Sequence, residues 1–459
     1  MVGSGMRFFD DDSNFETTPT TQSGITKLRV KDFLDRDFKS FSEYDCQINI
    51  PNMIDGFKIS QRKAAYVINR TNKLNTVERY SAQVASETAY HHGAGNLEGV
   101  IVGMAQNFPT SNNVNWFVPD GTFGNILDHK ASSGRYISVE GSPNFRKWFS
   151  KEDDLILEYE FEDGEQIEPT FFIPKVPTIL FNGSSGIGTG YSSTILNYNP
   201  DDVVRNVLQV VNGKKQTKLV PWYRGWTGTI SKADGQTTFR GKFERVNTTT
   251  ILITELPVGV EQEKYQSHLS KLIDKGWIKD YDDDSTEEAG WKITLYTTRE
   301  WLKSQTDEEL MVKLGLISRE SENIVVWDHN GKIKIFDSPE QLIEYFVEAR
   351  LGFYEQRRQK LIEATTEKIR WLSERMRFIL FYLDNSATFK NLKKDALVEL
   401  LQKNKFADYD RLLQMPIWNL TKDKIDELSK ATANEKSTLV ALEKDTAKDM
   451  YVRELKEIK

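Results

Sequence analysis

The spacing of apolar residues predicts that the chain is helical beyond Ser338. Apolar residues recur there at Leu342, Phe346, Ala349 and Phe353, at alternating steps of four and three. This period matches one face of an α-helix. The last part of the chain is therefore expected to begin with a long helix.

A second apolar series continues the helical pattern, and a third stretch follows an insert. The series consists of Leu372, Met376, Ile379 and Leu383. The stretch from Thr421 is rich in Lys, Glu and Leu and is also predicted to be helical. Because an insert of about residues 385–415 separates the two, we expect an antiparallel helix pair. An ordinary helical domain is the alternative.

The middle of the chain shows shorter apolar runs. Residues 170–198 alternate such runs with Gly and Pro, which favours strands and turns. Residues 222–300 contain β-type runs such as TTTILITEL and one helical stretch near 261–275. This part is expected to be an α/β region distinct from the N-terminal one.

The N-terminal part is expected to become globular near Lys27. Residues 1–24, rich in Thr, Ser, Asp and Pro, are predicted to be a disordered arm. Ser60 is expected to cap a helix over SQRKAAYVINR. Residues 84–108 are predicted to be helical with an interruption at HHGAG, and residues 116–125 to be a loop because of their turn signals.

Composition indicates a soluble globular protein of several domains. The 459 residues are 38% hydrophobic and 28% charged, and no apolar run is long enough for a membrane span. The acidic N-terminus does not look like a secretory signal. Cys46 is the single cysteine, which excludes an intramolecular disulfide and suggests a reducing, cytoplasmic compartment.

The net charge of −7 does not by itself suggest a nucleic-acid partner, but the local charge does. Residues 58–80 hold only one acid, Glu78, and a set of bases: Lys58, Arg62, Lys63, Arg70, Lys73 and Arg79. Such a cluster can contact a phosphate backbone. A solvated basic face is the alternative.

Several common catalytic motifs are missing from the sequence. There is no HExxH, CxxC, GxSxG or Walker loop. GIGTG at 186–190 lacks the full GxGxxG spacing, so it does not indicate dinucleotide binding. Without a phosphate-cradling loop, ATP hydrolysis by this chain alone is not supported.

A series of polar and glycine-rich motifs carries the strongest signal. In chain order they are PNMIDGFKISQRK (51–63), YHHG (90–93), AQNF (105–108), SNNVN (111–115), DGTFG (120–124), RYI (135–137), NGSSGIGTGYS (182–192), NYNP (197–200) and PWYRGWTGTI (221–230). Together, at these separations, they resemble the breakage-reunion core of type IIA DNA topoisomerases. The resemblance is closer to eukaryotic topoisomerase II and the T-even phage enzymes than to gyrase A.

The resemblance implies a multidomain α+β fold. Residues 25–174 would be a winged-helix DNA-cleavage domain, and residues 175–338 an α/β tower. Residues 339–459 would form a coiled-coil arm with a C-terminal dimer gate. Tyr409, Leu412, Leu413 and Met415, close together in the insert, could form an apolar patch for the two-fold contact. The alternative is that they only cap the helix pair within one chain.

The resemblance assigns the nucleophile to Tyr136, which directly follows Arg135 as in the family. Phenolate, with a pKa of ~10, leaves phosphorus more readily than an alkoxide, so a tyrosyl linkage suits a reversible reaction. Arg135 could hold two phosphate oxygens and offset charge in the transition state. Outside this context an Arg-Tyr pair would usually be an ordinary surface pair.

Other family positions carry bases expected near the phosphates. His92 and His91 match the His-Gly element beside the scissile phosphate, although His91 could be an ordinary hydrogen-bonding histidine. Lys58 and Arg62 match positions that face the DNA. Two further DNA-binding candidates are Lys63 and Asp55, with Asp55 orienting one of the bases.

Two isoleucines bear on how the DNA would be held. Ile187, among glycines, is expected to be a wedge inserted between base steps, since apolar wedges kink DNA; a buried isoleucine in a glycine turn is the alternative. Ile48 stands where family members carry an arginine, three residues before the proline of PNMIDG. Either another base substitutes there, or the enzyme cleaves weakly.

The resemblance also implies partners and cofactors. A homodimer on double-stranded DNA would place one tyrosine at each strand. Mg²⁺ would be held by the acidic TOPRIM domain of a partner subunit, which would also use ATP. The chain lacks both segments and resembles a phage cleavage subunit, so a hetero-oligomer in a host cytoplasm is expected.

Two other functions remain open at this point. One is a gate module that bends DNA without cutting it, suggested by Ile48. The other is a tyrosine recombinase, although its spaced Arg/His/Arg signature is not found in register.

Overall fold

The computed structural model describes residues 30–70, 73–233 and 235–458. The arm predicted for residues 1–24 lies outside the described residues. The chain divides into an N-terminal unit, which ends at Ala349 and also includes Ile458, and a C-terminal unit of Arg350–Glu457. The first mixes helices and strands and the second is helical, in agreement with the predicted mixed class.

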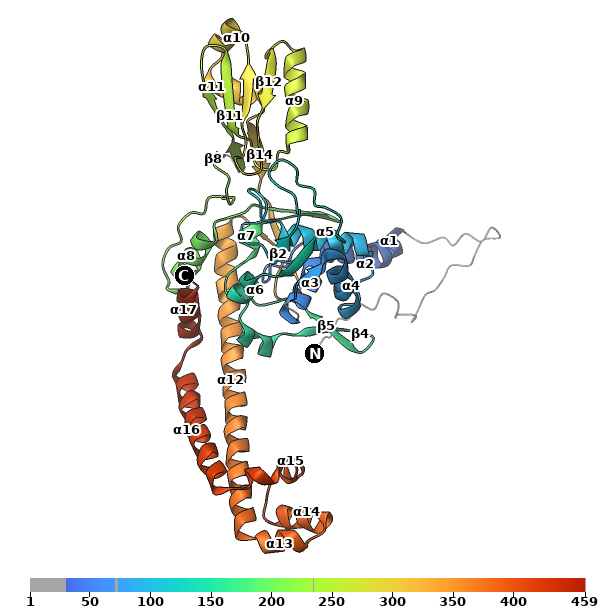
Figure 1. Ribbon diagram of the computed structural model, residues 1–459, viewed down its shortest axis with the longest axis vertical. Coiled ribbons are helices and arrows are strands. Elements are labelled where there is room, and N and C mark those ends of the chain that lie inside the picture. The colour runs from blue at the N-terminus through green and yellow to red at the C-terminus, as the bar shows by residue number, and fades with distance from the viewer. Residues whose placement is uncertain (1–29, 71–72, 234, 459) are drawn as a thin grey trace, which may run out of the picture. The chain divides into compact units, whose positions relative to one another are not determined.

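Three helices and a small sheet form the scaffold of the candidate site (Figure 1). The helices are α3 (Ile59–Arg70), α4 (Val77–Glu87) and α5 (Ala94–Ala105). The antiparallel sheet has the order β1-β3-β2, with β1 (Asn75–Thr76), β2 (Phe117–Asp120) and β3 (Ser138–Gly141). Val67, Tyr80 and Phe117 are completely buried between these elements. The predicted helical interruption at HHGAG is confirmed, since it separates α4 from α5.

Two local predictions need correction. Residues 117–120 are a strand, because their backbone pairs with β3, whereas a loop was predicted. Helix α3 begins at Ile59, so Ser60 lies inside the first turn and does not cap it. The backbone N–H of Lys58 donates instead to Gln61 Oε1 at 3.0 Å, one half of a capping box.

Further helices and hairpins surround this scaffold. A helical segment precedes it, formed by α1 (Val30–Phe33), the π-helix η1 (Leu34–Phe38) and α2 (Lys39–Asn49). The hairpins are β4 (Tyr159–Glu162) with β5 (Glu165–Pro169), β6 (Ser184–Gly188) with β7 (Tyr191–Ile195), and β15 (Ile324–Trp327) with β16 (Ile333–Phe336). The remaining short helices are α6 (Pro143–Trp148), η2 (Lys151–Ile156), α7 (Ile179–Asn182) and α8 (Pro200–Val211).

Residues 242–316, called the four-stranded unit below, have their own core. The antiparallel order is β10-β11-β13-β12, from β10 (Lys242–Arg245), β11 (Thr250–Glu255), β12 (Asp280–Asp283) and β13 (Ile293–Tyr296). Alternate residues of β11 point inward, so Ile251 and Ile253 pack with Leu269 of α9 (Gln262–Asp274). The helix predicted near 261–275 is confirmed. Helices α10 (Arg299–Lys303) and α11 (Asp307–Lys313) complete the unit.

A second small sheet adjoins this region in sequence. Its order is β14-β9-β8, from β8 (Thr229–Ala233), β9 (Gln236–Arg240) and β14 (Ile317–Ser321). Phe239 of β9 packs edge-on against Tyr223 and Trp226 of the PWYRGWTGTI motif. These aromatic residues therefore belong to the scaffold.

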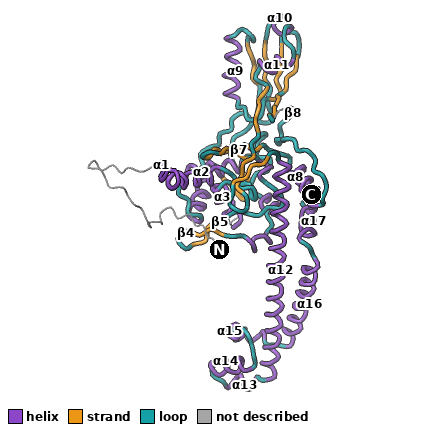
Figure 2. The backbone as a smooth tube through the Cα atoms, turned by 180° about the vertical axis from the view of Figure 1, so that it is seen from behind, coloured by secondary structure: helices purple, strands orange, loops and turns teal. Residues whose placement is uncertain are grey.

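Two antiparallel helices run side by side in the C-terminal unit, as Figures 1 and 2 show. They are α16 (Lys422–Lys444) and the part of α12 (Pro339–Asp384) that follows Ala349. Leu372 and Ile379 of α12 pack with Leu428 of α16. Lys368 Nζ lies 2.5 Å from Glu435 Oε1. The predicted helix pair is confirmed, and α17 (Ala447–Glu457) follows it.

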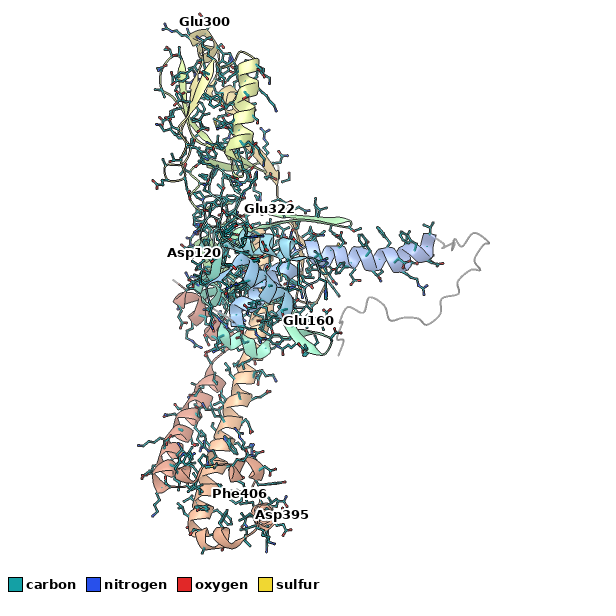
Figure 3. The ribbon with its side chains drawn as sticks, turned by 45° about the vertical axis from the view of Figure 1, so that its right-hand side comes forward. Asp120, Glu160, Glu300, Glu322, Asp395 and Phe406 are labelled. Carbon is teal, nitrogen blue, oxygen red and sulfur yellow. The ribbon has the colours of Figure 1, made fainter. Side chains whose placement is uncertain are left out.

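The insert between these helices has a small apolar core around Phe406, which Figure 3 labels. It is built from α13 (Ser386–Asn391), α14 (Lys394–Lys403), α15 (Tyr409–Leu413) and η3 (Ile417–Asn419). Leu412 is completely buried, and Tyr409, Leu413 and Met415 are partly buried against the same core. The predicted apolar patch is therefore largely internal. Ile417 and Trp418 lie at the surface, each 77% exposed.

No helix among the described residues is both long enough and apolar enough to cross a membrane.

Candidate active site

Tyr136 lies on a tight turn at the end of the loop between β2 and β3. The β-ladder closes at the pair Asp120–Ser138, only two residues beyond the tyrosine. The Tyr136 N–H donates to Ser133 O at 2.9 Å. The side chain of Tyr136 is 78% exposed, whereas its neighbour Ile137 is buried. The backbone is thus held while the phenol projects into solvent.

The start of helix α4 fixes this turn. The first N–H groups of a helix have no partner within it. Here the Glu78 N–H donates to Gly134 O at 3.1 Å, and the Val77 N–H donates to Ile137 O at 3.0 Å. A Cβ on Gly134 would lie 2.5 Å from Glu98 Oε2, so the turn packs closely against α5. We name residues 133–137 the tyrosine turn.

Arg135 is exposed beside the tyrosine. Its guanidinium carbon lies 6.0 Å from the centre of the Tyr136 ring. Among the described residues, no carboxylate forms an ion pair with Arg135. Its five N–H donors are therefore available to an anion such as a phosphate.

Asp55 and Arg62 form a buried ion pair. Arg62 Nε donates to Asp55 Oδ2 at 2.6 Å, and Arg62 Nη2 donates to Phe57 O at 3.1 Å. Asp55 also accepts from the backbone N–H groups of Phe57 and Phe172. Burial opposes the charge of Arg62, but Asp55 more than offsets this effect and raises the pKa of the guanidinium. The prediction that Asp55 orients a base is confirmed.

Lys63 is buried and paired as well. Its Nζ lies 2.8 Å from Glu168 Oε1 and donates to Thr88 O at 2.5 Å. Burial raises the pKa of Glu168, although Lys63 works against this. The charges of Lys63 and Asp55 are thus paired within the protein, and their role in binding DNA stays a prediction. Arg62, 7% exposed, is likewise committed to the protein interior.

Lys58 reaches the hairpin that carries Ile187. Its Nζ donates to Ser185 O of β6 at 2.6 Å, and burial lowers its pKa. Ile187 is 80% exposed and pairs with Ser192 across the hairpin. The alternative of a buried isoleucine is thereby excluded.

The hairpin β6–β7 is seated on α2. Asp45 Oδ2 accepts from the Thr189 N–H and the Thr189 hydroxyl, both at 2.8 Å. A Cβ on Gly186 would lie 2.0 Å from Asn49 O, so only glycine allows this approach. Ile48, at the position where the resemblance predicts an arginine, is half-buried on the same helix.

The two histidines have different partners. His92 Nε2 lies 2.7 Å from the Tyr44 hydroxyl, and burial raises the pKa of Tyr44. His91 Nε2 lies 3.1 Å from Glu162 Oε1 of β4. Both imidazoles are exposed. Tyr44 was missed by sequence reasoning, because nothing in its local pattern shows that α2 contacts the His-Gly element.

Asparagines of the polar motifs join segments far apart in sequence. Asn182 Nδ2 donates to Val114 O at 2.7 Å, and its Oδ1 accepts from the Val114 N–H at 2.9 Å. Asn113 Nδ2 donates to Tyr198 O at 3.1 Å and to Trp222 O at 2.9 Å. These residues hold the scaffold together.

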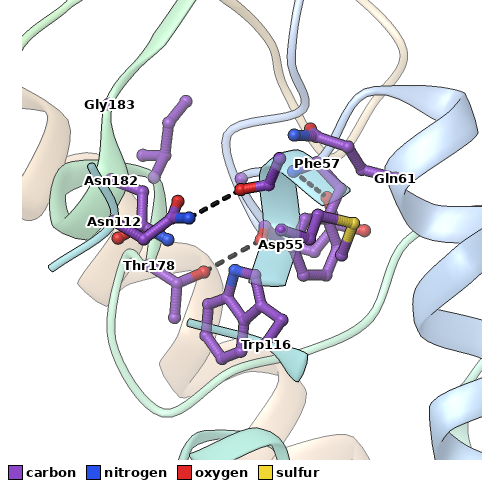
Figure 4. A pocket seen from close by; sticks show the side chains of 12 residues that line it. Asp55, Phe57, Gln61, Asn112, Trp116, Thr178, Asn182 and Gly183 are labelled. Carbon is purple, nitrogen blue, oxygen red and sulfur yellow. Dashed lines mark hydrogen bonds between the residues drawn. The ribbon is translucent and has the colours of Figure 1, made fainter. Parts of the chain in front are cut away.

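A cavity of about 80 Å³ lies behind the Asp55 loop (Figure 4). Its polar lining groups are already bonded to backbone: Asn112 Nδ2 donates to Gly103 O at 2.6 Å, and Thr178 Oγ1 donates to Asp55 O at 2.9 Å. Trp116 and Ile179 supply apolar walls. The residues that line the cavity therefore help to hold the Asp55 loop in place.

The structure thus brings together Arg135 with Tyr136, Arg62 with Asp55, and Lys58 with the Ile187 hairpin. No hydrogen bond or ion pair between described residues connects Tyr136 or Arg135 with Lys58 or His92. In the described ranges, no group of three or more His, Cys, Asp or Glu side chains is arranged to hold a metal ion. These residues therefore do not provide the ligand set that the expected Mg²⁺ would need.

Comparison with known proteins shows which family the chain is similar to. Residues 49–456 match the family model that describes the A subunit of DNA gyrase/topoisomerase IV. The chain is 36% identical over 401 residues to a DNA topoisomerase 2 of Arabidopsis thaliana, covering 84% of this chain and 27% of that protein. It is 31% identical to a DNA topoisomerase 2 of Penicillium chrysogenum, covering 94% of this chain and 30% of that protein.

A solved structure has the same fold. The DNA-binding, cleavage and re-ligation domain of Plasmodium falciparum topoisomerase II superposes with a TM-score of 0.86 at 31% identity, over 93% of this chain and 63% of that chain. The chain spans less than a third of the length of the curated relatives named above. With nearly the whole sequence matched by one family model and one fold, the chain belongs to the DNA gyrase/topoisomerase IV A-subunit family of type IIA topoisomerases.

Proposed function

We propose that this chain is the DNA-cleaving and rejoining component of an ATP-dependent type IIA topoisomerase, with Tyr136 as the nucleophile. One observation carries the proposal. An exposed phenol stands on a backbone turn fixed by α4, next to an arginine that has no carboxylate partner among the described residues. A tyrosine serving the core would be buried, as Tyr80 is.

The chemistry follows from the phenolic oxygen. It would form a bond to phosphorus while the bond to the 3′ oxygen breaks, leaving a 5′-phosphotyrosyl end and a free 3′ hydroxyl. Arg135 would hold the non-bridging oxygens as charge develops on them. Reversal uses the 3′ oxygen as nucleophile and the phenolate as leaving group, so the DNA is resealed without another energy source.

Lys58, His92 and Ile187 would act on the DNA around this point. Lys58 and His92 are proposed to bind phosphates, and Ile187 to enter a base step and kink the duplex. The exposure of Ile187 on a hairpin held close to α2 supports the wedge. Arg62 supports Lys58 indirectly, because its pair with Asp55 holds the loop that precedes α3.

The finer architecture is also a proposal. Residues 25–174 would be the winged-helix domain, 175–338 the tower, and 339–459 the coiled coil and dimer gate. The helix pair of α12 and α16 supports the last of these. The Ile187 hairpin packs on α2 of the first segment. It is also bonded to Asn323 of its own segment, whose Nδ2 donates to Ser192 O at 2.7 Å.

The remaining components are proposed to come from elsewhere. Mg²⁺, when bound, would offset charge at the scissile phosphate, with ligands from the TOPRIM domain of a partner. ATP would be used by the same partner. Two copies of this chain would cut the two strands. The relatives named above are eukaryotic, and an origin in a phage stays a prediction.

Trapping with denaturant tests the proposal. The chain is mixed with supercoiled DNA, Mg²⁺ and an ATPase/TOPRIM subunit from a T-even phage topoisomerase, and the reaction is stopped with detergent. We expect linear DNA with protein attached to both 5′ ends, and none with Tyr136→Phe.

The gate module suggested by Ile48 gives the opposite result. A protein that only bends DNA would shift the duplex in a native gel and leave no covalent complex after detergent. That outcome would replace the proposal with the gate function.

A further inference from the structure

The loop that leads to Tyr136 extends into the core of the four-stranded unit. It runs over residues 121–137, between β2 and β3. Near its middle, Ile126 is only 7% exposed and packs in one cluster with Ile251 and Leu269, and Leu127 packs against the same cluster. Tyr136 and Ile126, which is buried in the core of the four-stranded unit, thus lie on the same loop.

Polar contacts reinforce this attachment. His129 Nδ1 lies 3.3 Å from Glu261 Oε1, at the start of α9, while its ring stacks on Phe108 with centres 5.0 Å apart. The Gln262 N–H of α9 donates to Leu127 O at 3.1 Å. Two independent types of contact therefore hold the loop to the same helix.

The loop is also stiff between this attachment and the tyrosine turn. Gln106 Nε2 donates to Phe123 O at 3.0 Å and to His129 O at 2.9 Å, which ties the two arms together. A Cβ on Gly124 would lie 2.7 Å from His129 O, so the arms are in close contact. The Ser132 N–H donates to Thr122 O at 3.0 Å, one residue before the tyrosine turn begins.

We propose that Ile126 and the His129–Glu261 pair are positioning residues for Tyr136: they join the tyrosine turn to the four-stranded unit, so that displacement of this unit moves the nucleophile. A loop cross-linked at both ends transmits such a displacement because it has few internal degrees of freedom. The inference rests on the proposed function, in which a bent duplex would bear on the protein on both sides of the cut. Cleavage would then depend on how the four-stranded unit is held.

Hydrogen exchange tests the connection without any chemistry. The amides of Val77 and Glu78 bond only to carbonyls of the tyrosine turn, so they report its detachment from α4. In the full chain, Ile126→Ala is expected to speed exchange of these amides roughly tenfold, and Ile126→Val to restore most of the protection. Val312→Ala is the matched control, because Val312 is 60% exposed on α11 of the same unit.

A second variant tests the connection without removing an apolar side chain from the core of the four-stranded unit. Glu261→Gln keeps the shape of the side chain and removes its charge, and it is expected to give a smaller increase at the same amides. If exchange rises within the four-stranded unit while Val77 and Glu78 stay protected in both variants, Ile126 only fills a core and the inference is wrong.

A second experiment tests the effect on function. It measures the single-turnover rate at which the chain becomes covalently attached to a nicked duplex, with Mg²⁺ and the phage ATPase/TOPRIM subunit present. Ile126→Ala should lower the rate about tenfold at unchanged DNA affinity, since positioning acts on the reacting geometry. An equal loss of affinity and rate would contradict positioning. If the wild-type chain forms no adduct, the proposed function fails, while the exchange experiment still decides the connection.

Discussion

Asp55 and Arg62 form a buried ion pair that holds the loop before α3. Asp55 accepts from Arg62 and from two backbone N–H groups, one of them 117 residues away at Phe172. Asp55→Ala would leave a buried guanidinium without its charge partner, so we expect a loss of about 3–5 kcal/mol in the free energy of unfolding. Denaturant titration measures it.

Asp120→Ala serves as the control for this substitution. Asp120 lies exposed at the end of β2 (Figure 3), and removal of its carboxylate should change the free energy of unfolding by no more than about 0.5 kcal/mol. Equal losses for the two variants would contradict the assignment of Asp55 to the scaffold.

Ile187 gives the opposite case, an apolar residue on the surface. Because it is 80% exposed, Ile187→Ala should leave the melting temperature unchanged, whereas a core isoleucine would cost about 2–5 kcal/mol. If Ile187 is a wedge, the variant should bend DNA less, measured by energy transfer between fluorophores at the duplex ends. Normal bending would rule out the wedge.

At the residue scale, the sequence shows which residues are apolar and which are polar. It does not show which charged side chains form ion pairs within the protein. Lys58, Arg62 and Lys63 look alike in a basic run. Lys63 is buried because Glu168, 105 residues away, completes its pair. Such pairing depends on tertiary contacts, and no local pattern reports it.

Among the elements, the loop of residues 121–137 holds a histidine, His129, whose partial burial affects its protonation. Burial lowers the pKa of this imidazole from its ordinary value near 6.5, against the opposing effect of Glu261. The unfolded chain then binds the proton more readily than the folded one. Neutral His129 therefore contributes to the free energy of unfolding at pH values above its ordinary pKa. This contribution is lost as the pH falls through the lowered pKa of the folded protein.

This sign gives a test by thermal unfolding. Between about pH 7 and about pH 5, the melting temperature of the wild type should fall more than that of His129→Gln, which cannot be protonated. Other titrating groups, including His268, whose pKa is also lowered, are common to both proteins. Parallel curves would show that His129 does not contribute.

Helices were predicted better than short strands. The apolar series of α12 and the run of α9 have the helical period, and their existence follows from local sequence. Strand β2 contains Pro119 beside turn residues and forms only because β3 lies next to it. Strand pairing of this kind depends on a partner distant in sequence.

For the whole molecule, exposed apolar side chains point to the insert as a contact between two copies of the chain. Ile417 and Trp418 are each 77% exposed beside a hollow of about 200 Å³ lined by residues such as Phe378 and Leu412. We predict a homodimer at micromolar concentration without DNA, because exposed apolar residues of this size favour association.

Sedimentation of the full chain and of point variants checks this prediction. Ile417→Asp and Trp418→Asp should shift the protein to a monomer, and Val440→Asp, at a 47% exposed position of α16, should not. Truncation near Ser338 is unsuitable, since Leu342 and Phe346 of α12 are completely buried. A wild-type monomer would refute the proposed gate.

The family and the fold class could be predicted from the ordered motifs, whereas the division into units could not. The boundary at Arg350 falls inside α12, where the helical pattern continues without a break. The exact patch could not be predicted either: Leu412, Leu413 and Met415 line the hollow beside Ile417, but they also pack against the core around Phe406. A helical period shows which residues share a face, but not which partner covers it.

The central claim is that Tyr136 becomes joined to a 5′ end of DNA. The most direct measurement digests the denaturant-trapped complex with protease and nuclease and identifies the modified peptide by mass spectrometry. The account predicts one adduct, a 5′-nucleotide linked through phosphate to the Tyr136 hydroxyl, absent from Tyr136→Phe. An adduct on another residue, a linkage to the 3′ end, or an adduct that persists in Tyr136→Phe would contradict it.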